Sequence, residues 1–332
     1  MMLRVRYWGV ALLGAGVPAM ATADVPDVAV DIPPLHSLVD RVMGDLGSPE
    51  LVIQPGASPH GYSMRPSEAS ALERADVVFW VGEALAPWLG ESIDSLAADA
   101  DSVPLLDVEG TRTLDFRRGA TFEAHDHGHA HEGHDHEHDH AHAHAHEGHD
   151  HAAHGHSHDG TDPHAWLDPA NARVWLDAIA ESLAKADPEH AETYQENARL
   201  GKAELDELIA DLQARLEGTH DTRFIVFHDA YQYFEQRFDL SAAGAISLGD
   251  ASDPSPARID ELRNTVTELG VDCVFSEPQF TPQLVDNVFG PTGVNTSIVI
   301  DPLGADLTPG ESLYPRLLQQ LAEGVADCAS AT

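Results

Sequence analysis

Three histidines in this chain occupy positions that are typical of ligands in an α/β protein. His60 lies in the turn-rich stretch "PGASPHGY" after a short apolar run, and His228 ends the apolar run "FIVFH". His164 lies in the proline-framed stretch "DPHAWLDP". Ligands of open α/β sheets bind beyond the carboxyl ends of the strands. Each histidine alone is explained more simply as a polar side chain near a loop, but together they predict a metal site.

A carboxylate completes this candidate donor set. Asp301 ends another apolar run, in "IVIDPLG". Three imidazole nitrogens and one carboxylate oxygen suit a four-coordinate Zn²⁺, with about 2.0–2.2 Å from the metal to each ligand. Mn²⁺ prefers more oxygen donors, although this is a preference and not an exclusion. We therefore expect His60, His164, His228 and Asp301 to converge on one zinc site.

The other histidines fall into two groups. Sixteen of the 22 lie between His125 and His158, often at every second position. His36, in "PLHSLVD", follows the first apolar run and is a further candidate for a ligand or for a neighbour of one. His190 and His220 are expected to be solvated.

The histidine-rich tract is predicted to be disordered over 123–160, because it has almost no large apolar side chain that could offset its ordering entropy. Its H-x-H and H-x-x-H spacings offer imidazole pairs, which are mostly neutral at pH 7 because model imidazole has a pKa near 6.5. A flexible tract lacks fixed geometry, so we interpret it as an accessory zinc scavenger, reservoir or sensor. The alternative is a solvated low-complexity spacer.

Alternating short apolar runs and helical patterns predict two α/β lobes, each with a mostly parallel sheet covered by helices. Strands are expected at 28–32, 51–53, 77–81, 103–108, 224–227, 242–246, 271–275 and 297–300, and helices at 35–43, 67–74, 85–96, 168–184, 230–238, 256–269, 282–288 and 313–326.

One long helix is expected to join the lobes. Asp187-Pro188 is typical of a helix start and Gly218 of a helix end, and leucines recur between them at three- to four-residue spacing. We interpret 188–218 as a rigid linking helix between a first metal-binding lobe, 24–187, and a second, 219–332.

The first residues predict export. Residues 1–23 have a basic start, a short apolar stretch and a small-x-small cleavage pattern, which together are typical of a signal peptide. The predicted location is the periplasm. There Cys273 and Cys328, the only cysteines, would most simply form one structural disulfide between a strand and the C-terminal helix.

The charge of the chain limits its partners. Fifty-six acidic against 18 basic residues give a formal net charge of −38, which argues against nucleic acid and anionic membranes. Acidity of this kind serves solubility or attracts cations.

Several long segments resemble one family. "PGASPHGYSMRPSEASALERADVVFWVG", "DPHAWLDP", "VFHDAYQYFEQRFDL", "VFSEPQF" and "IDPLG" look like zinc-type substrate-binding proteins of bacterial ABC metal importers, in the right order along the whole mature chain. The resemblance implies two lobes on a rigid helix, metal held by His60, His164 and His228, and a Cys273–Cys328 disulfide.

The resemblance leaves the fourth ligand open. Some zinc members carry a glutamate directly before the first ligand histidine, where this chain has Pro59. Asp301 or water then remains as the fourth ligand. Manganese-type relatives use an aspartate that corresponds to Asp301, so this residue does not decide the metal.

The resulting hypothesis is a monomeric binding protein, without enzymatic activity, that captures Zn²⁺ and delivers it to an inner-membrane ABC permease, with periplasmic zinc chaperones as further candidate partners. The alternatives are an importer component for Mn²⁺ or Fe²⁺ and a zinc buffer without a permease. A zinc hydrolase would need a general base, for which Asp229 is the only obvious candidate near a ligand, and the sequence has no H-E-x-x-H motif.

Overall fold

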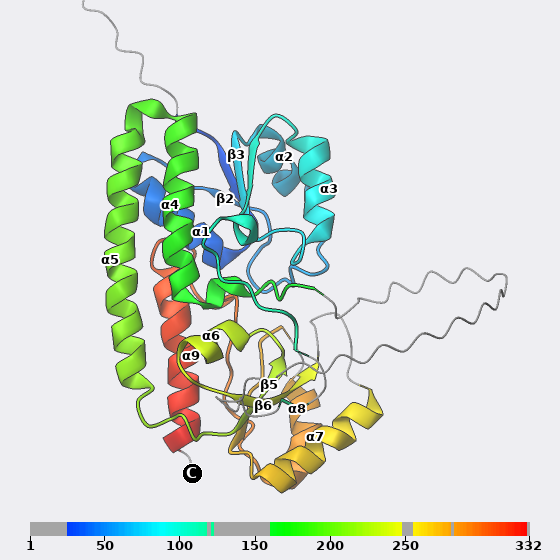
Figure 1. Ribbon diagram of the computed structural model, residues 1–332. Helices are drawn as coiled ribbons and strands as arrows, with labels where there is room; N and C mark the ends of the chain where they lie inside the picture. The colour runs from blue at the N-terminus through cyan, green and yellow to red at the C-terminus, as the bar shows by residue number, and fades with distance from the viewer. Residues whose placement is uncertain (1–24, 118–120, 123–159, 248–254, 280–281, 331–332) are drawn as a thin grey trace, which may run out of the picture.

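The computed structural model describes residues 25–117, 121–122, 160–247, 255–279 and 282–330. It contains two parallel sheets with helices packed around them (Figure 1). The predicted α/β class is confirmed. The expected signal peptide, 1–23, and nearly all of the expected disordered tract, 123–160, lie outside the described residues.

The first sheet has the order β2-β1-β3-β4, with all neighbours parallel. Its strands are β1 (Val28–Val30), β2 (Glu50–Leu51), β3 (Val77–Trp80) and β4 (Asp101–Pro104). Both β1 and β3 are fully buried, as expected for central strands of a parallel sheet that is covered on both faces. The ladder continues past β2, because the Ile53 N–H donates to the Asp31 carbonyl at 2.9 Å. The chain therefore leaves the carboxyl edge of this sheet directly into the loop with His60.

The helices around the first sheet begin with proline. Proline is favoured in the first turn because that N–H has no partner within the helix. The helices are α1 (Pro33–Met43), α2 (Pro66–Arg74), α3 (Pro87–Leu96) and α4 (Pro169–Ala186), with short 3₁₀ turns at Gly44–Leu46, Leu105–Asp107 and Ala165–Leu167.

The second sheet has the order β6-β5-β7, again parallel. Its elements are β5 (Phe224–His228), α6 (Gln232–Arg237), β6 (Ala242–Ser247), α7 (Pro256–Leu269), β7 (Cys273–Val274), α8 (Pro282–Phe289), a 3₁₀ turn at Gly290–Thr292 and α9 (Leu313–Ser330). A disulfide joins Cys273 of β7 to Cys328 of α9, with their Cα atoms 5.9 Å apart.

The expected strand at 297–300 is wrong. The structure has only single parallel bridges there, between Cys273 and Asn295 and between Ser276 and Val299. The Asn295 carboxamide accepts hydrogen bonds from the Ser297 N–H and hydroxyl, and such local bonds compete with a ladder. The neighbouring β7 is also only two residues long.

The long helix is shorter than expected. A 3₁₀ turn occupies Pro188–His190, and α5 (Ala191–Arg215) follows with 25 residues. Its length is about 37 Å at 1.5 Å per residue. It runs along α4 and past both sheets, and also contacts α1 and α9 (Figure 1).

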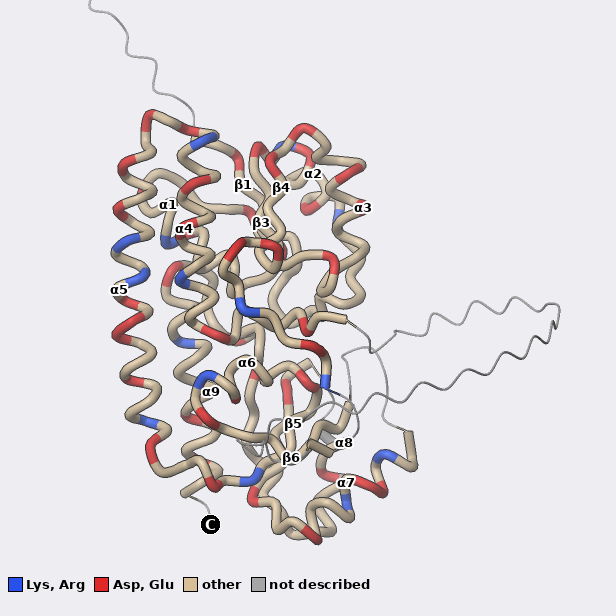
Figure 2. The backbone as a smooth tube through the Cα atoms, viewed as in Figure 1, with Lys and Arg blue, Asp and Glu red and all other residues tan. Residues whose placement is uncertain are grey.

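The largest buried apolar cluster includes side chains from both sheets, such as Phe79 of β3 and Val226 of β5. A core shared in this way does not divide the chain at single residues, so the lobe boundaries 24–187 and 219–332 stay a prediction. We call the part built on the β2-β1-β3-β4 sheet the first lobe and the part built on the β6-β5-β7 sheet the second lobe. Acidic residues are spread over the helices of both (Figure 2). In the described part of the chain, no helix has the length and apolarity to cross a membrane.

Candidate metal site

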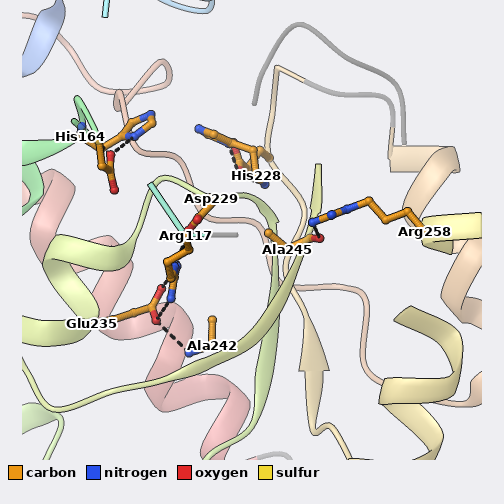
Figure 3. Close-up of polar contacts among 10 residues, drawn as sticks. Arg117, His164, His228, Asp229, Glu235, Ala242, Ala245 and Arg258 are labelled. Atoms are coloured by element: carbon orange, nitrogen blue, oxygen red, sulfur yellow. Dashed lines mark hydrogen bonds and ion pairs between the residues drawn. The ribbon is translucent and has the colours of Figure 1, made fainter. Parts of the chain in front are cut away.

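Two of the three candidate histidines face each other where the lobes meet. His164 directly precedes the 3₁₀ turn Ala165–Leu167 of the first lobe, and His228 is the last residue of β5 in the second lobe. Their ring centroids are 5.3 Å apart, and both side chains are buried, at 3 % and 2 % exposure (Figure 3). Three nitrogens around a tetrahedral zinc would place neighbouring ring centroids roughly 5 Å apart.

A buried carboxylate orients the His164 ring. Asp162 accepts hydrogen bonds from the backbone N–H of His164 at 3.0 Å and from its Nδ1 at 2.7 Å. An ionised Asp162 carboxylate can only accept this bond, which assigns the hydrogen to Nδ1 and leaves the lone pair on Nε2, the atom that a metal would need. Burial raises the pKa of Asp162 to about 7, although the His164 N–H and the charge of Arg117 act against this.

A second buried carboxylate orients His228 in the same way. The two Glu277 oxygens lie 2.9 and 2.7 Å from Nδ1 of His228, and one of them also accepts the His228 backbone N–H at 3.3 Å. Glu277 follows β7, the strand beside β5, so both residues leave the same edge of the second sheet. Nε2 of His228 therefore carries the lone pair, as in His164.

The third ring, like that of His164, comes from the first lobe. His60 lies in the loop after β2, with its ring centroid 5.6 Å from that of His164. Its side chain is only partly buried, unlike the other two. The three rings are thus neighbours in space. Within the described residues, however, no three His, Cys, Asp or Glu side chains already stand in an arrangement that could hold a metal ion.

Asp301 is engaged by its own loop. Its Oδ1 accepts the Leu303 N–H at 2.9 Å and the Gln279 side-chain amide at 2.8 Å, and its Oδ2 accepts the Ala305 N–H at 2.5 Å. This loop reaches the candidate site through Trp166, whose indole N–H donates to the Pro302 carbonyl at 2.8 Å. Asp301 thus precedes the residue that Trp166 binds, while its own bonds to Leu303 and Ala305 shape a turn.

The remaining histidines have other partners. Nε2 of His36 lies 3.0 Å from the Pro49 carbonyl, and burial lowers the pKa of this imidazole. Nδ1 of His190 lies 2.6 Å from Asp187, and Nδ1 of His220 lies 3.0 Å from the Asp239 carbonyl. In each case the ring contacts a carbonyl or carboxylate of the surrounding chain.

Asp229, the candidate base of a hydrolase, is paired with an arginine. The Arg117 guanidinium donates to Asp229 from Nε at 2.9 Å and also from Nη2, and to Glu235 at 2.7 and 2.8 Å (Figure 3). Burial raises the pKa of Asp229, and the charge of Arg117 opposes this rise. The guanidinium also lies 3.8 Å from the centre of the Phe122 ring. Asp229 thus balances a buried cation.

Several bonds hold the His164 loop against the second lobe. Arg237 of α6 makes a bidentate pair with the buried Asp168 carboxylate, at 2.6 and 2.8 Å. The Tyr233 hydroxyl donates to the Asp162 carbonyl at 2.8 Å, and that of Tyr314 donates to the Trp166 carbonyl at 2.6 Å. His164 and His228 are therefore fixed relative to each other.

The two orienting carboxylates, Asp162 and Glu277, were not predicted from the sequence. Asp162 has a local signal, because an aspartate two residues before a histidine can accept that residue's backbone N–H. Glu277 could have been found by the argument used for His228, since both residues follow parallel strands that end at one edge. It lies in "VFSEPQF", one of the segments that resemble the zinc-type binding proteins.

Comparison with known proteins identifies the family. Residues 28–328 match the family described as "Zinc-uptake complex component A periplasmic". The chain belongs to this family. The chain is 49 % identical over 306 residues to the high-affinity zinc uptake system protein ZnuA of Brucella suis, which covers 91 % of each chain. The corresponding protein of Paracoccus denitrificans is 47 % identical over 321 residues, covering 97 % and 96 %.

A solved structure agrees with the fold. The crystal structure of a zinc-bound ZnuA with residues 138–173 of its own chain deleted superimposes with a TM-score of 0.71, over 92 % of this chain and 98 % of that one, at 24 % identity. The resemblance inferred from the sequence motifs is thus confirmed, and zinc is the ligand that the family takes up.

Proposed function

We propose that this protein captures Zn²⁺ in the periplasm through His60, His164 and His228 and delivers it to an inner-membrane ABC permease. Zinc uptake follows from the family, while the three-histidine site and the delivery step are our inference. The observation that carries the proposal is the pair of buried carboxylates, Asp162 and Glu277, at 2.7 Å from the Nδ1 atoms of two neighbouring histidines.

This arrangement suits zinc for a chemical reason. A ligating histidine usually donates its second ring N–H to a carboxylate or carbonyl, which fixes its tautomer and makes the ligating nitrogen more basic. Three neutral imidazoles with one remaining position match the coordination that Zn²⁺ accepts. Asp301 or a water molecule takes that fourth position.

The contacts between the lobes bear on how the permease distinguishes loaded from empty protein. The Arg237–Asp168 pair and the bonds of Tyr233 and Tyr314 would all have to break for the lobes to swing apart. We therefore expect zinc to shift loops at the mouth of the site more than it moves whole lobes. Hydrogen exchange that is identical with and without zinc in every loop would contradict this part.

The tract at 125–158 is proposed as an accessory. Its 16 histidines offer many weak and exchangeable sites, whereas selectivity requires ligands held in place. It would collect zinc near the fixed site without replacing it.

The test is a zinc titration against a competing chelator, followed by native mass spectrometry. The mature protein is compared with a version that lacks 125–158 and with His60→Ala in each form. His220→Ala is the matched control, because it removes an exposed histidine whose ring contacts the Asp239 carbonyl. We expect one tight zinc that survives the deletion, and we expect His60→Ala to be the only one of these changes that turns it into weak binding.

Other outcomes would change the assignment. If the deletion abolishes tight binding, the tract is the site. If Mn²⁺ is retained in preference to Zn²⁺, the protein serves a different metal. A loaded protein that does not bind its cognate permease would instead be a zinc buffer.

A further inference from the structure

The loop with His60 is anchored by side chains from two helices. The indole Nε1 of Trp88, in the first turn of α3, donates to the carbonyl of Pro59 at 2.9 Å. The Tyr62 hydroxyl and the Arg65 N–H donate to the buried Glu68 carboxylate of α2 at 2.9 and 2.6 Å. His60 thus lies between two anchors, one residue after the first and two residues before the second.

The Trp88 anchor is the one next to the ligand. Pro59 is buried and its carbonyl belongs to the peptide bond that leads into His60, so the indole fixes the direction in which the chain enters the site. The rings of Trp88 and Tyr62 are also 5.9 Å apart, which brings the two anchors into contact with each other. Both side chains pack on the core of the first lobe.

We propose that Trp88 is a positioning residue for His60, and that its hydrogen bond to Pro59 sets the rate at which zinc leaves the site. This inference rests on the zinc site proposed above. His164 and His228 are almost completely buried, whereas His60 is only partly buried and lies on a loop, so His60 is the proposed ligand that swings away first. The strength of its nearest anchor then governs the opening step.

The test uses Trp88→Phe, which keeps an aromatic ring but removes the donor together with part of the indole's packing surface. Trp80→Phe is the matched control, because the Trp80 indole donates to the Ser102 hydroxyl at 3.1 Å in the same lobe, between β3 and β4. Zinc dissociation is followed by stopped flow into excess fluorescent chelator. The protein is the mature chain from which only residues 125–158 are deleted. Loss of one neutral hydrogen bond should raise the dissociation rate about fivefold, with an unchanged association rate.

A double-mutant cycle separates positioning from a general structural effect. In the His60→Ala background, Trp88→Phe should no longer change zinc dissociation, because the ligand through which it acts is absent. Persistence of the effect in that background, or an equal effect of Trp80→Phe, would overturn the inference. The inference would also be overturned if His60→Ala raises the zinc dissociation rate and Trp88→Phe leaves it unchanged. If His60→Ala itself leaves zinc binding unchanged, the proposed zinc site is wrong, and the role of Trp88 falls with it.

Discussion

His164 and His228 differ from His60 in burial and in what fixes them. The first two are 3 % and 2 % exposed, and each has a carboxylate 2.7 Å from Nδ1. His60 is only partly buried, and its loop is anchored through Pro59 and Tyr62. Two of the proposed ligands are thus part of a rigid core, while the third is carried on a partly buried loop.

This difference explains how one site can be both selective and reversible. Ligands fixed before binding lose little conformational freedom when the metal arrives, which favours the geometry they were built for. A third ligand on a loop can leave without unfolding anything else, because loops open at a lower free energy than core elements. A transport protein needs both properties, since it must hold its cargo and then release it.

The largest effect on zinc affinity should come from removing one of the proposed ligands, either the buried His228 or the partly buried His60. Loss of a residue that orients a ligand costs about 10–100-fold in metal affinity. His228→Ala and His60→Ala should each lower zinc affinity by more than this. Only His228→Ala should also destabilise the metal-free protein, by about 1–3 kcal/mol, because it leaves the buried Glu277 carboxylate without its histidine. His60→Ala should change unfolding by less than about 0.5 kcal/mol.

Urea unfolding of both variants in chelator measures this contrast. His220→Ala provides the baseline for loss of an exposed imidazole. Equal destabilisation by His228→Ala and His60→Ala would show that the two kinds of ligand are not held differently.

The second prediction removes an orienting charge and keeps its shape. Glu277→Gln should lower zinc affinity about 10–100-fold, since the His228 tautomer is no longer fixed by an anion. Glu204→Gln is the control, because it neutralises an exposed carboxylate paired with Arg41. Chelator competition gives both affinities. An affinity in Glu277→Gln within twofold of the parent would remove the basis for the orienting role.

Most of the fold could be predicted, because local patterns agree with the packing. Helical spacing of apolar residues predicted the helices to within a few residues, and short apolar runs predicted the central strands. The failures are at edges. Residues 297–300 have the right apolar pattern, but Val299 is 58 % exposed and the segment pairs only through single bridges. Because the neighbouring β7 is only two residues long, residues 297–300 have little strand to pair with. The length of β7 cannot be predicted from residues 297–300.

The candidate site was predictable in its histidines and not in its carboxylates. His60 and His228 follow strands, and the edge of a parallel sheet collects such residues. Glu277 is 49 residues from His228 along the chain, and only the β5–β7 pairing brings them together. Asp229 shows the opposite error, because its partner Arg117 lies 112 residues away and could not be inferred.

Asp31 is a buried carboxylate that accepts hydrogen bonds from backbone N–H groups, so it offers a reference for Asp162 and Glu277, which contact histidines. Asp31 accepts the N–H groups of Ile32 and Val81, both at 2.7 Å, and burial raises its pKa to about 7. An exposed aspartate has a pKa near 3.9. Between about pH 4 and 7 the folded chain therefore holds a proton that the unfolded chain has released. This contribution to stability is complete below pH 4 and is lost as the pH rises through 7.

Asp31→Asn should remove that contribution. Plots of unfolding free energy against pH for the parent and the variant should differ in slope by at most about 1.4 kcal/mol per pH unit between pH 5 and 6. The difference should be the same with and without zinc, because Asp31 bonds to backbone N–H groups and not to a ligand. A slope difference that disappears on zinc binding would place Asp31 in the site.

The smallest effect is expected at Asp301. Its carboxylate already accepts hydrogen bonds from Gln279, Leu303 and Ala305, which favours a water molecule as the fourth ligand. Asp301→Asn should cost about 1 kcal/mol of stability, since its amide would face one of the backbone donors, while zinc affinity falls less than tenfold. Isothermal titration with Zn²⁺ and Mn²⁺ decides the matter. A complete loss of zinc in a folded variant would make Asp301 a ligand and would extend the fixed side of the site from two residues to three.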